Sequence, residues 1–577
     1  MTSAPERQHG RRLAAIALLV AALAGPGAAS PGQDFIAKGR EALAHGDGIS
    51  AEVSLRRALA AGAPRAAVAA YMGEALLDQD APDKAREWLE PGAFTPGTAA
   101  LGFRRLAQLE RTQGNLAAAG TAFDRAMAIT PRDATMWVEI GRLRYVGGEH
   151  MLAIEAADYA LRLDPDNVRA LEFKGQLARD SQGLTAGLPW FERALRRHPR
   201  DVSVLGEYAA TLGDLGRTRK MLEVTRLMLA IEPGNPRAYF LQAILAARAG
   251  NVELARGLFA RTRDKFDDIP AGKLLEGVLE MEAGNYVLAA EALSGLARAQ
   301  PGNARVTRLL ARAYALGGED RLVVHDYAGA AGGADASPYM LTLVARAYEA
   351  DGRRDLAAPL LDRASLAHLP PLSPIAAGSE VGSLLAAGNN AEAAQTADRH
   401  VAANPGSAFS QAIAGDVRLA AGDGAGALEH YRLAAYVRLS QSLLQRMVAA
   451  STQSGQGAGA ATLVEMFLAA NPGDRAAARM AANEAAIAGD WRRARRLLEY
   501  VRDSGGASDT ALLADLSLAQ LRGGDVKAAE ATARKAYALQ RANPAAAQAW
   551  ALSLDALGRR ALAQALLAKS RGAFAIR

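Results

Sequence analysis

The chain has 577 residues, enough for about three or four ordinary domains, and half of its residues are apolar although only 5% are aromatic. It contains no cysteine, which excludes disulfides, thiolate nucleophiles, thiolate metal sites and a lipidated N-terminal cysteine. The formal net charge of +6 is modest for this length and argues against nucleic acid as a partner.

Residues 1–30 have the composition of a secretory signal peptide. Arginines among the first twelve residues precede an uncharged apolar run at Leu13–Leu23, and small residues follow. This order is typical of a cleaved export signal, and the run is shorter than the roughly 20 residues of a membrane-spanning helix. We predict cleavage near Ala29 or Ser30, no stable membrane span afterwards, and a periplasmic protein. The alternative is an uncleaved N-terminal anchor.

Proline recurs beyond this segment with a period of 34 residues. It stands at 131, 165, 199, 233 and 301, and Asp267 takes the missing place. Glycine follows the same period, except where Gln182 interrupts it beside Gly183, at positions 114, 148, 216, 250, 284, 318, 352, 388, 422, 455, 489, 524 and 558. A small residue, usually alanine, stands five places after most of these glycines. Three series with one period indicate a chain of repeated units.

Each unit reads as two helices. Glycine closes the first helix because it adopts the left-handed conformation of a helix C-terminus, and proline ends the second because it cannot continue it. Alanines in the second helix allow close approach, and larger residues such as Phe191 and Tyr431 fill the gap toward the next pair. One pair cannot bury its apolar face alone, so the pairs are expected to stack.

The unit that begins near residue 134 carries a recognisable pattern. Its spaced residues are Trp137, Ile140, Gly141, Ala153, Ala160 and Pro165. The pattern resembles the tetratricopeptide repeat (TPR), W-x₂-L-G-x₂-Y…A-x₃-F…P, which has the same length. The resemblance covers about sixteen units from residue 32 onward. It implies an all-α, right-handed superhelical solenoid of about sixteen helix-turn-helix repeats.

The repeats divide at a proline-rich stretch. HLPPLSPIAAG at residues 368–378 adds residues to one repeat and predicts a hinge. The expected organisation is therefore a signal peptide at 1–30, an N-terminal array at 31–367, the hinge, and a C-terminal array at 379–577.

No pattern of catalytic or metal-binding residues emerges. The eight histidines lack metal-ligand spacing and are interpreted as solvated, including His150 and His430. GQGAGA at residues 455–460 falls at a turn between helices and not after a strand, so it is not read as a dinucleotide loop. Asp267 and Asp268 stand between repeats, where helix caps are expected. We therefore predict a protein that is not an enzyme and needs no cofactor or metal.

A TPR array offers a surface for binding. In the family, positions 2, 5, 9, 12 and 13 of each repeat face the concave groove. Carried over, these positions hold Arg104, Arg111, Arg142, Arg169, Arg179, Arg237, Arg248, Arg305, Arg308, Arg312 and Arg346. The acidic residues at the same positions are Glu172, Asp180, Asp214, Glu282 and Glu349.

One hypothesis is a basic groove for an anionic ligand, since arginine holds carboxylates bidentately. Its strongest candidates are Arg305, Arg308 and Arg312, which share one helix. The alternative is that these arginines are solvated helix formers, several of them paired with neighbours such as Glu172 and Glu349.

The resemblance implies a scaffold for protein partners. Exported arrays of this length resemble periplasmic scaffolds of exopolysaccharide synthesis and envelope machinery. We expect envelope proteins, bound through acidic peptide segments or C-termini, as partners. Two alternatives remain: a groove that binds anionic polysaccharide or another glycan, and a membrane-anchored adaptor. The inward aromatic residues are too dispersed for a sugar-stacking track.

Overall fold

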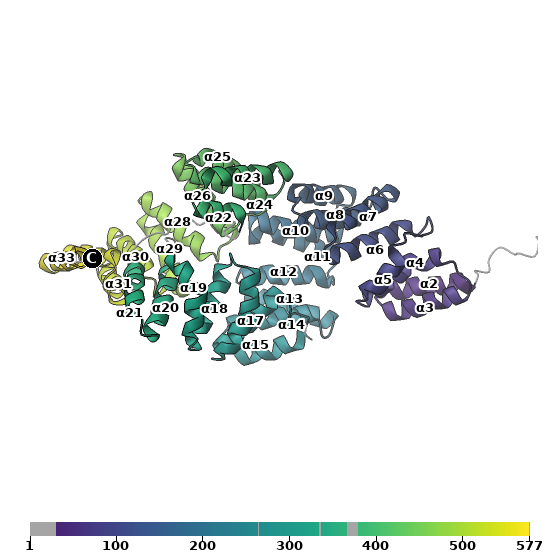
Figure 1. Cartoon of the computed structure of the whole chain (residues 1–577), viewed down its shortest axis with the longest axis horizontal. Helices are drawn as coiled ribbons and strands as arrows, with labels where there is room; N and C mark the ends of the chain where they lie inside the picture. Colours follow the sequence, from purple (N-terminus) through teal and green to yellow (C-terminus); the bar gives the residue numbers. More distant parts are fainter. Residues whose placement is uncertain (1–30, 263–264, 334–335, 366–378, 576–577) are drawn as a thin grey trace, which may run out of the picture. The chain divides into compact units, whose positions relative to one another are not determined.

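The computed structural model describes residues 31–575 apart from 263–264, 334–335 and 366–378 (Figure 1). The predicted signal segment 1–30 and the predicted hinge 368–378 lie outside the described residues. The chain forms two compact units, one ending at Leu143 and one beginning at Arg144. This division concerns the packing of the repeats and leaves the predicted hinge untested.

The first unit consists of stacked helix pairs. Its helices are α2 (Pro31–Ala44), α3 (Gly48–Ala60), α4 (Arg65–Asp78), α5 (Pro82–Leu89), α6 (Ala99–Thr112) and α7 (Leu116–Ile129). Helix α8 (Ala134–Val146) contains the boundary between the two units.

The second unit continues the same pattern. Its helices up to residue 365 are α9 (His150–Leu163), α10 (Val168–Gln182), α11 (Leu184–Arg197), α12 (Val202–Asp214), α13 (Thr218–Ile231), α14 (Pro236–Arg248), α15 (Val252–Phe259), α16 (Pro270–Glu282), α17 (Tyr286–Ala299), α18 (Ala304–Leu316), α19 (Asp320–Gly332), α20 (Pro338–Ala350) and α21 (Arg354–Ser365). From residue 379 they are α22 (Glu380–Ala386), α23 (Asn390–Ala403), α24 (Ala408–Ala420), α25 (Gly424–Val437), α26 (Gln441–Gln453), α27 (Gly457–Ala470), α28 (Arg475–Ile487), α29 (Trp491–Val501), α30 (Thr510–Arg522), α31 (Val526–Leu539), α32 (Pro544–Ala556) and α33 (Arg560–Ala575).

These 32 α-helices confirm the predicted all-α fold of about sixteen helix pairs. No strand occurs in the described residues. The glycine series explains the regularity, because all of its members have φ between +72° and +88°, the left-handed region that ends a helix. The stretch GQGAGA begins in the turn between α26 and α27, as expected, and its last four residues form the first turn of α27.

Within a pair, a large side chain of the second helix covers a glycine of the first. A Cβ atom at Gly175 would lie 2.5 Å from the ring of Phe191, and one at Gly415 would lie 2.4 Å from the ring of Tyr431. Only glycine leaves room for the ring at such a distance. The predicted large residues therefore fill space inside their own pair as well as toward the next one.

Polar residues just before a first helix cap it. Asn167, Asp201 and Asn235 accept hydrogen bonds from backbone N–H groups at the start of α10, α12 and α14. The expected cap from Asp268 is wrong for α16, whose N-cap residue is Ile269 and which has no side-chain cap. The carboxylate of Asp268 instead lines a cavity.

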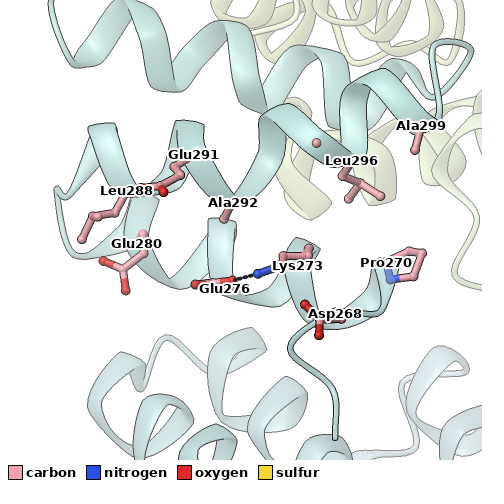
Figure 2. A pocket seen from close by; sticks show the side chains of 11 residues that line it. Asp268, Pro270, Lys273, Glu276, Glu280, Leu288, Glu291, Ala292, Leu296 and Ala299 are labelled. Carbon is pink, nitrogen blue, oxygen red and sulfur yellow. Dashed lines mark hydrogen bonds and ion pairs between the residues drawn. The ribbon is translucent and has the colours of Figure 1, made fainter. Parts of the chain in front are cut away.

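The helix that precedes this cavity in the chain is short. Helix α15 has eight residues, whereas α13 and α17, the second helices of the flanking repeats, have fourteen. A 3₁₀ turn at Ala260–Thr262 and a loop continue the chain to α16. Beside this shortened helix, between α16 and α17, a cavity of about 430 Å³ opens (Figure 2).

Candidate binding surface

The structure places all eleven predicted arginines on first helices of repeats, from α6 to α20. Their surroundings differ from repeat to repeat. The neighbours of each guanidinium decide whether its charge is available to a ligand.

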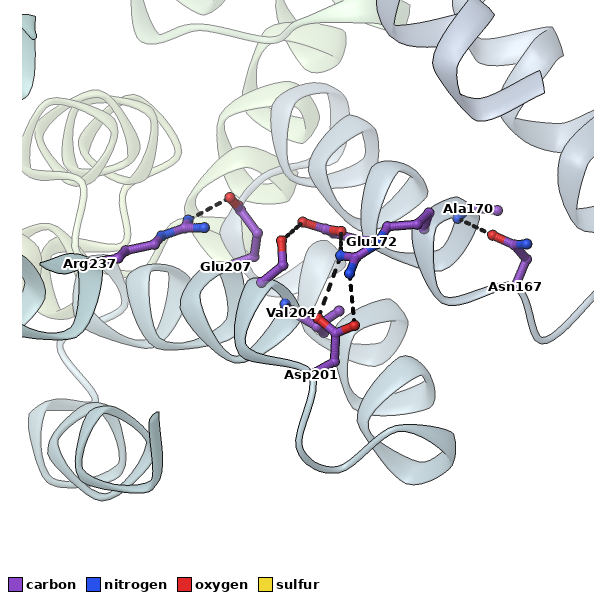
Figure 3. Close-up of polar contacts among 9 residues, drawn as sticks. Asn167, Ala170, Glu172, Asp201, Val204, Glu207 and Arg237 are labelled. Atoms are coloured by element: carbon purple, nitrogen blue, oxygen red, sulfur yellow. Dashed lines mark hydrogen bonds and ion pairs between the residues drawn. The ribbon is translucent and has the colours of Figure 1, made fainter. Parts of the chain in front are cut away.

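Arg169 of α10 belongs to a network of ion pairs that reaches the start of α12 (Figure 3). Arg169 lies 2.8 Å from Glu172 in its own helix and 3.0 Å from Asp201, which precedes α12. The hydroxyl of Ser203 donates a further hydrogen bond of 2.7 Å to Glu172. Glu172 is only 4% exposed, so its charge is compensated inside the fold.

A second network joins three successive repeats. Glu207 of α12 lies 3.0 Å from Arg179 of α10 and 2.6 Å from Arg237 of α14. Burial would raise the pKa of the Glu207 carboxyl, but Arg237 and Arg179 outweigh it and hold this pKa below its ordinary value. Arg248 of α14 lies 3.1 Å from Asp214 and donates to the carbonyl of Gly213. These arginines hold repeats together.

The first unit gives its arginines a similar role. Arg104 lies 3.8 Å from Asp133 and, with Arg111, faces the carboxyl group of Glu139. Burial raises the pKa of Glu139 despite these positive charges. Arg142 also has an interaction partner. Farther along the chain, Arg346 pairs with Glu349, as expected if these arginines are solvated helix formers paired with their neighbours.

Helix α18 is different. Arg305, Arg308 and Arg312 occupy one face at spacings of three and four residues, and all three are exposed. Among the described residues, no acidic side chain pairs with any of them. We call these three residues the basic face.

An aromatic side chain of the next repeat adjoins the basic face. Tyr339 at the start of α20 is 43% exposed, and Arg312 and Arg308 lie close enough to counteract the rise that burial causes in the pKa of its phenol. A phenolic hydroxyl next to two guanidinium groups provides donors and a ring surface for one ligand.

The predicted acidic residue Asp180 belongs to a contact that sequence reasoning missed. It accepts a 3.0 Å hydrogen bond from the hydroxyl of Tyr145, and burial together with this carboxylate raises the pKa of Tyr145 to about 12. The backbone carbonyl of Asp180 accepts a 2.9 Å hydrogen bond from the N–H of Leu439, 259 residues further along the chain. Helix α10 therefore meets the turn between α25 and α26.

Two more turns contact the same region. We call the whole set, in which α9–α11 meet residues 404–408, Leu439 and Asn471, the return contact. The Asn404 side chain donates to the carbonyl of Gly148, and the N–H of Ala408 donates to His150 Nδ1 at 3.1 Å. The Asn471 side chain accepts from the N–H of Leu184 at 3.1 Å.

The histidine interpretation needs correction here. His150 is half-buried in the return contact, and burial together with Arg438 lowers its pKa. His430 is half-buried as well and bonds to Gln411 through Nδ1. Neither histidine is simply solvated, because neighbouring helices cover both rings. In the described residues, no group of three or more acidic or histidine side chains is arranged to hold a metal ion.

The kind of repeat is indicated by the helix pairs and by a family comparison. The tetratricopeptide repeat model matches residues 138–202, 274–320 and 344–408. These stretches are similar to the tetratricopeptide repeat, a fold that is typically a non-catalytic scaffold for protein partners. No described helix is long and apolar enough to cross a membrane.

Individual relatives are distant. The CTR9 homolog of Arabidopsis thaliana is 30% identical over 134 residues, a match that spans 22% of this chain and 12% of the relative. Solved structures with similar folds include PilW, a type IV pilus biogenesis factor (17% identity, 37% of this chain, 98% of PilW, TM-score 0.30), and Pseudomonas aeruginosa PilF (18%, 38%, 99%, 0.31). The APC/C hetero-tetramer Cut9–Hcn1 matches over 97% of this chain and 96% of the other, with 12% identity and a TM-score of 0.40.

Proposed function

We propose that this TPR scaffold binds acidic segments of partner proteins through the basic face of α18. The observation that carries the proposal is the contrast among its own arginines. Those of α10 and α14 are neutralised by Glu172, Asp201, Glu207 and Asp214, whereas the basic face meets no acidic side chain in the described part of the chain.

The chemistry favours carboxylates. Each guanidinium presents a planar set of donors that matches a carboxylate in two parallel hydrogen bonds. Two arginines one turn apart on α18 suit side chains from an acidic peptide or a peptide C-terminus, and Tyr339 adds a hydroxyl beside them.

We further propose that the chain is exported and serves an assembly of the cell envelope, with exopolysaccharide secretion as one candidate. The order of charged, apolar and small residues in 1–30 supports export. N-terminal sequencing of the protein recovered from a periplasmic fraction tests this step. A start near residue 30 is the expected result, and an intact N-terminus in the cytoplasmic fraction would contradict it.

A glycan-binding groove is the second candidate, because acidic polysaccharide also carries carboxylates. Polyglucuronate and an acidic peptide distinguish the two ligands in parallel titrations. The protein-partner proposal expects the peptide to bind more tightly than a matched length of polyglucuronate.

A pull-down from envelope extract tests the basic face. The full-length baits are the wild type, the variant R305A/R308A/R312A, and the control R56A/R197A/R534A, which removes three exposed arginines elsewhere. Partners retained by the control and lost by the first variant would support the proposal and identify the pathway. Identical partner sets for all three baits would contradict it.

A further inference from the structure

The return contact joins turns that are far apart in the chain but belong to the same compact unit. The side chain of Asn404 donates to the carbonyl of Gly148, 256 residues earlier. The side chain of Asn471 accepts from the N–H of Leu184, 287 residues earlier. The repeats between these points, including the one that carries the basic face, therefore form a closed circuit.

Turns and helix ends make the hydrogen bonds of this contact. The N–H of Leu439 donates to the carbonyl of Asp180 at 2.9 Å, and the N–H of Met151 donates to the carbonyl of Gly406 at 3.4 Å. With the bonds of the two asparagines, three successive exit turns of the later repeats meet α9, α10 and α11. The contact is polar along its length.

The apolar cores on the two sides of the contact are separate. Leu171 and Phe191 belong to a cluster formed by α10–α14, whereas Leu428 and Tyr431 belong to a cluster formed by α24–α26. A helix pair is held by such buried apolar side chains. A few hydrogen bonds between turns contribute little net free energy, because water replaces each of them when the contact opens. The return contact is therefore able to open while the helix pairs stay folded.

A histidine accepts one of these hydrogen bonds. His150 is the first residue of α9, and its Nδ1 accepts from the N–H of Ala408 at 3.1 Å. A ring nitrogen accepts only while it carries no proton, and an imidazolium has N–H donors at both nitrogens. Protonation of His150 turns this bond into a contact between two donors.

The surroundings of His150 oppose its protonation while the contact is closed. The ring of Tyr145 packs edge-on against it at 4.9 Å between centroids, and the hydroxyl of Tyr145 donates to Asp180. Burial and the positive charge of Arg438 lower the pKa of His150. The neighbouring Glu149 lies near an arginine of α8 at 3.9 Å. A proton on His150 is therefore held more weakly in the closed state than in water.

Two more histidines lie behind the turn that bonds to His150. The ring of His400 packs edge-on against Phe409. His430 bonds through Nδ1 to the side-chain oxygen of Gln411 at 2.8 Å. Because this oxygen can only accept, His430 donates in either protonation state and keeps the bond. Protonation of His430 therefore does not break a hydrogen bond as protonation of His150 does.

We propose that the return contact is a pH-sensitive clasp, closed while His150 is neutral and open when its ring is protonated. Opening exposes the imidazolium to water and moves it away from Arg438, so proton binding and opening favour each other. Acidification releases α9–α11 from the three exit turns, and the repeats between them become free to change their mutual twist. The clasp does not depend on the proposed role of the basic face, because it uses other helices.

Two introduced cysteines make this opening measurable, since the chain has none of its own. Nitroxide labels at E155C on α9 and E392C on α23, both exposed positions, report the distance between the two sides by double electron–electron resonance. At pH 7.5 we expect one short distance. At pH 5.0 the population at longer distances is expected to rise at least about fivefold, and to fall again when the pH is restored.

Variants assign the response to His150. In H150Q the amide oxygen can accept from the N–H of Ala408 at any pH, so we expect a change of less than about twofold. R438Q retains the histidine but removes a charge that opposes its protonation in the closed state, so it should open less at pH 5.0 than the wild type. H325Q removes a histidine with an 81% exposed side chain and should open like the wild type.

Three results would overturn the proposal. The first is a wild-type distance distribution that is the same at pH 7.5 and pH 5.0, and the second is a response of H150Q or R438Q as large as that of H325Q. The third is a loss of far-UV circular dichroism in step with the change in distance, since the helices would then be unfolding instead of separating. An unchanged helical signal is the expected result.

Discussion

The arginines of first helices behave differently in α10 and in α18, although Arg169 and Arg305 occupy the same position of their repeats. Arg179 of α10 faces Glu207 of the next first helix, 28 residues further on, and Arg169 faces Asp201 at 32 residues. The same distance of 32 residues from Arg305 of α18 leads to Ser337, the N-cap residue of α20, and the nearby Asp335 lies outside the described residues. An arginine on a first helix is therefore structural or available according to what the following repeat presents.

Breaking a more deeply buried ion pair should cause the largest loss in the free energy of unfolding. Arg446 of α26 is 4% exposed and lies 3.1 Å from Asp416 of α24, which also accepts from the hydroxyl of Tyr431. R446A leaves a buried carboxylate without its cation and is expected to reduce the free energy of unfolding by about 3–5 kcal/mol. Urea unfolding followed by far-UV circular dichroism measures the loss. The exposed Arg432 provides the control, and equal midpoints for R432A and R446A would contradict the account.

Breaking the ion-pair network of α10, α12 and α14 should cause the second-largest loss in the free energy of unfolding. E207A leaves Arg179 and Arg237 without their shared partner, and both guanidinium groups are less buried than that of Arg446. We expect a loss of about 2 kcal/mol in the same unfolding experiment. An unfolding midpoint within error of the wild type would show that these arginines are as available as those of α18.

The return contact supplies a pH-dependent prediction. His150 accepts a hydrogen bond from Ala408 in its neutral form, and its pKa is lowered in the folded protein by burial and by Arg438. Below pH about 6.5 the unfolded chain gains a proton that the folded chain resists, so stability falls as the pH decreases and levels off below the folded pKa.

Thermal unfolding between pH 7.5 and pH 5.5 measures this effect. H150Q should lose part of the acid sensitivity of the wild type, and so should H430Q, because the pKa of His430 is also lowered by burial. Parallel pH profiles of the wild type and H150Q would contradict this role of His150.

The basic face should show the smallest effect on stability. Removing Arg308 breaks no ion pair with a described residue, so R308A is expected to change the free energy of unfolding by less than about 0.5 kcal/mol. Urea unfolding beside E207A gives the comparison directly. A loss as large as that of E207A would mean that Arg308 supports the fold.

The repeat architecture was predictable because it depends on local chemistry. Glycine at positive φ and proline at the exit act within their own helices, so their period determines the helix pairs. The ion pairs of Arg169 and Arg179 were also within reach of the sequence. Asp201 stands 32 positions ahead of Arg169, whereas Ser337 stands at that distance from Arg305.

The return contact was not predictable in this way. Contacts over 256 to 287 residues depend on small rotations that accumulate from repeat to repeat. Two departures from the repeat pattern do mark the contact. Leu439 occupies a position of the proline series and supplies the backbone N–H that a proline would lack. Gly183 has no side chain and therefore leaves space for the side chain of Asn471. Asp267 in place of proline was a local signal near the shortened α15.

The most direct test of the central claim is a titration of an acidic peptide against the basic face. A fluorescein-labelled peptide of aspartate and glutamate with a free C-terminus is followed by anisotropy, with the wild type, R305A/R308A/R312A and the control R56A/R197A/R534A. We predict that the first variant binds at least about tenfold more weakly than the wild type, because charge-assisted hydrogen bonds are lost, and that the control changes little. Equal weakening by both triple variants would mean that the peptide responds only to net charge, and would contradict a binding site on α18.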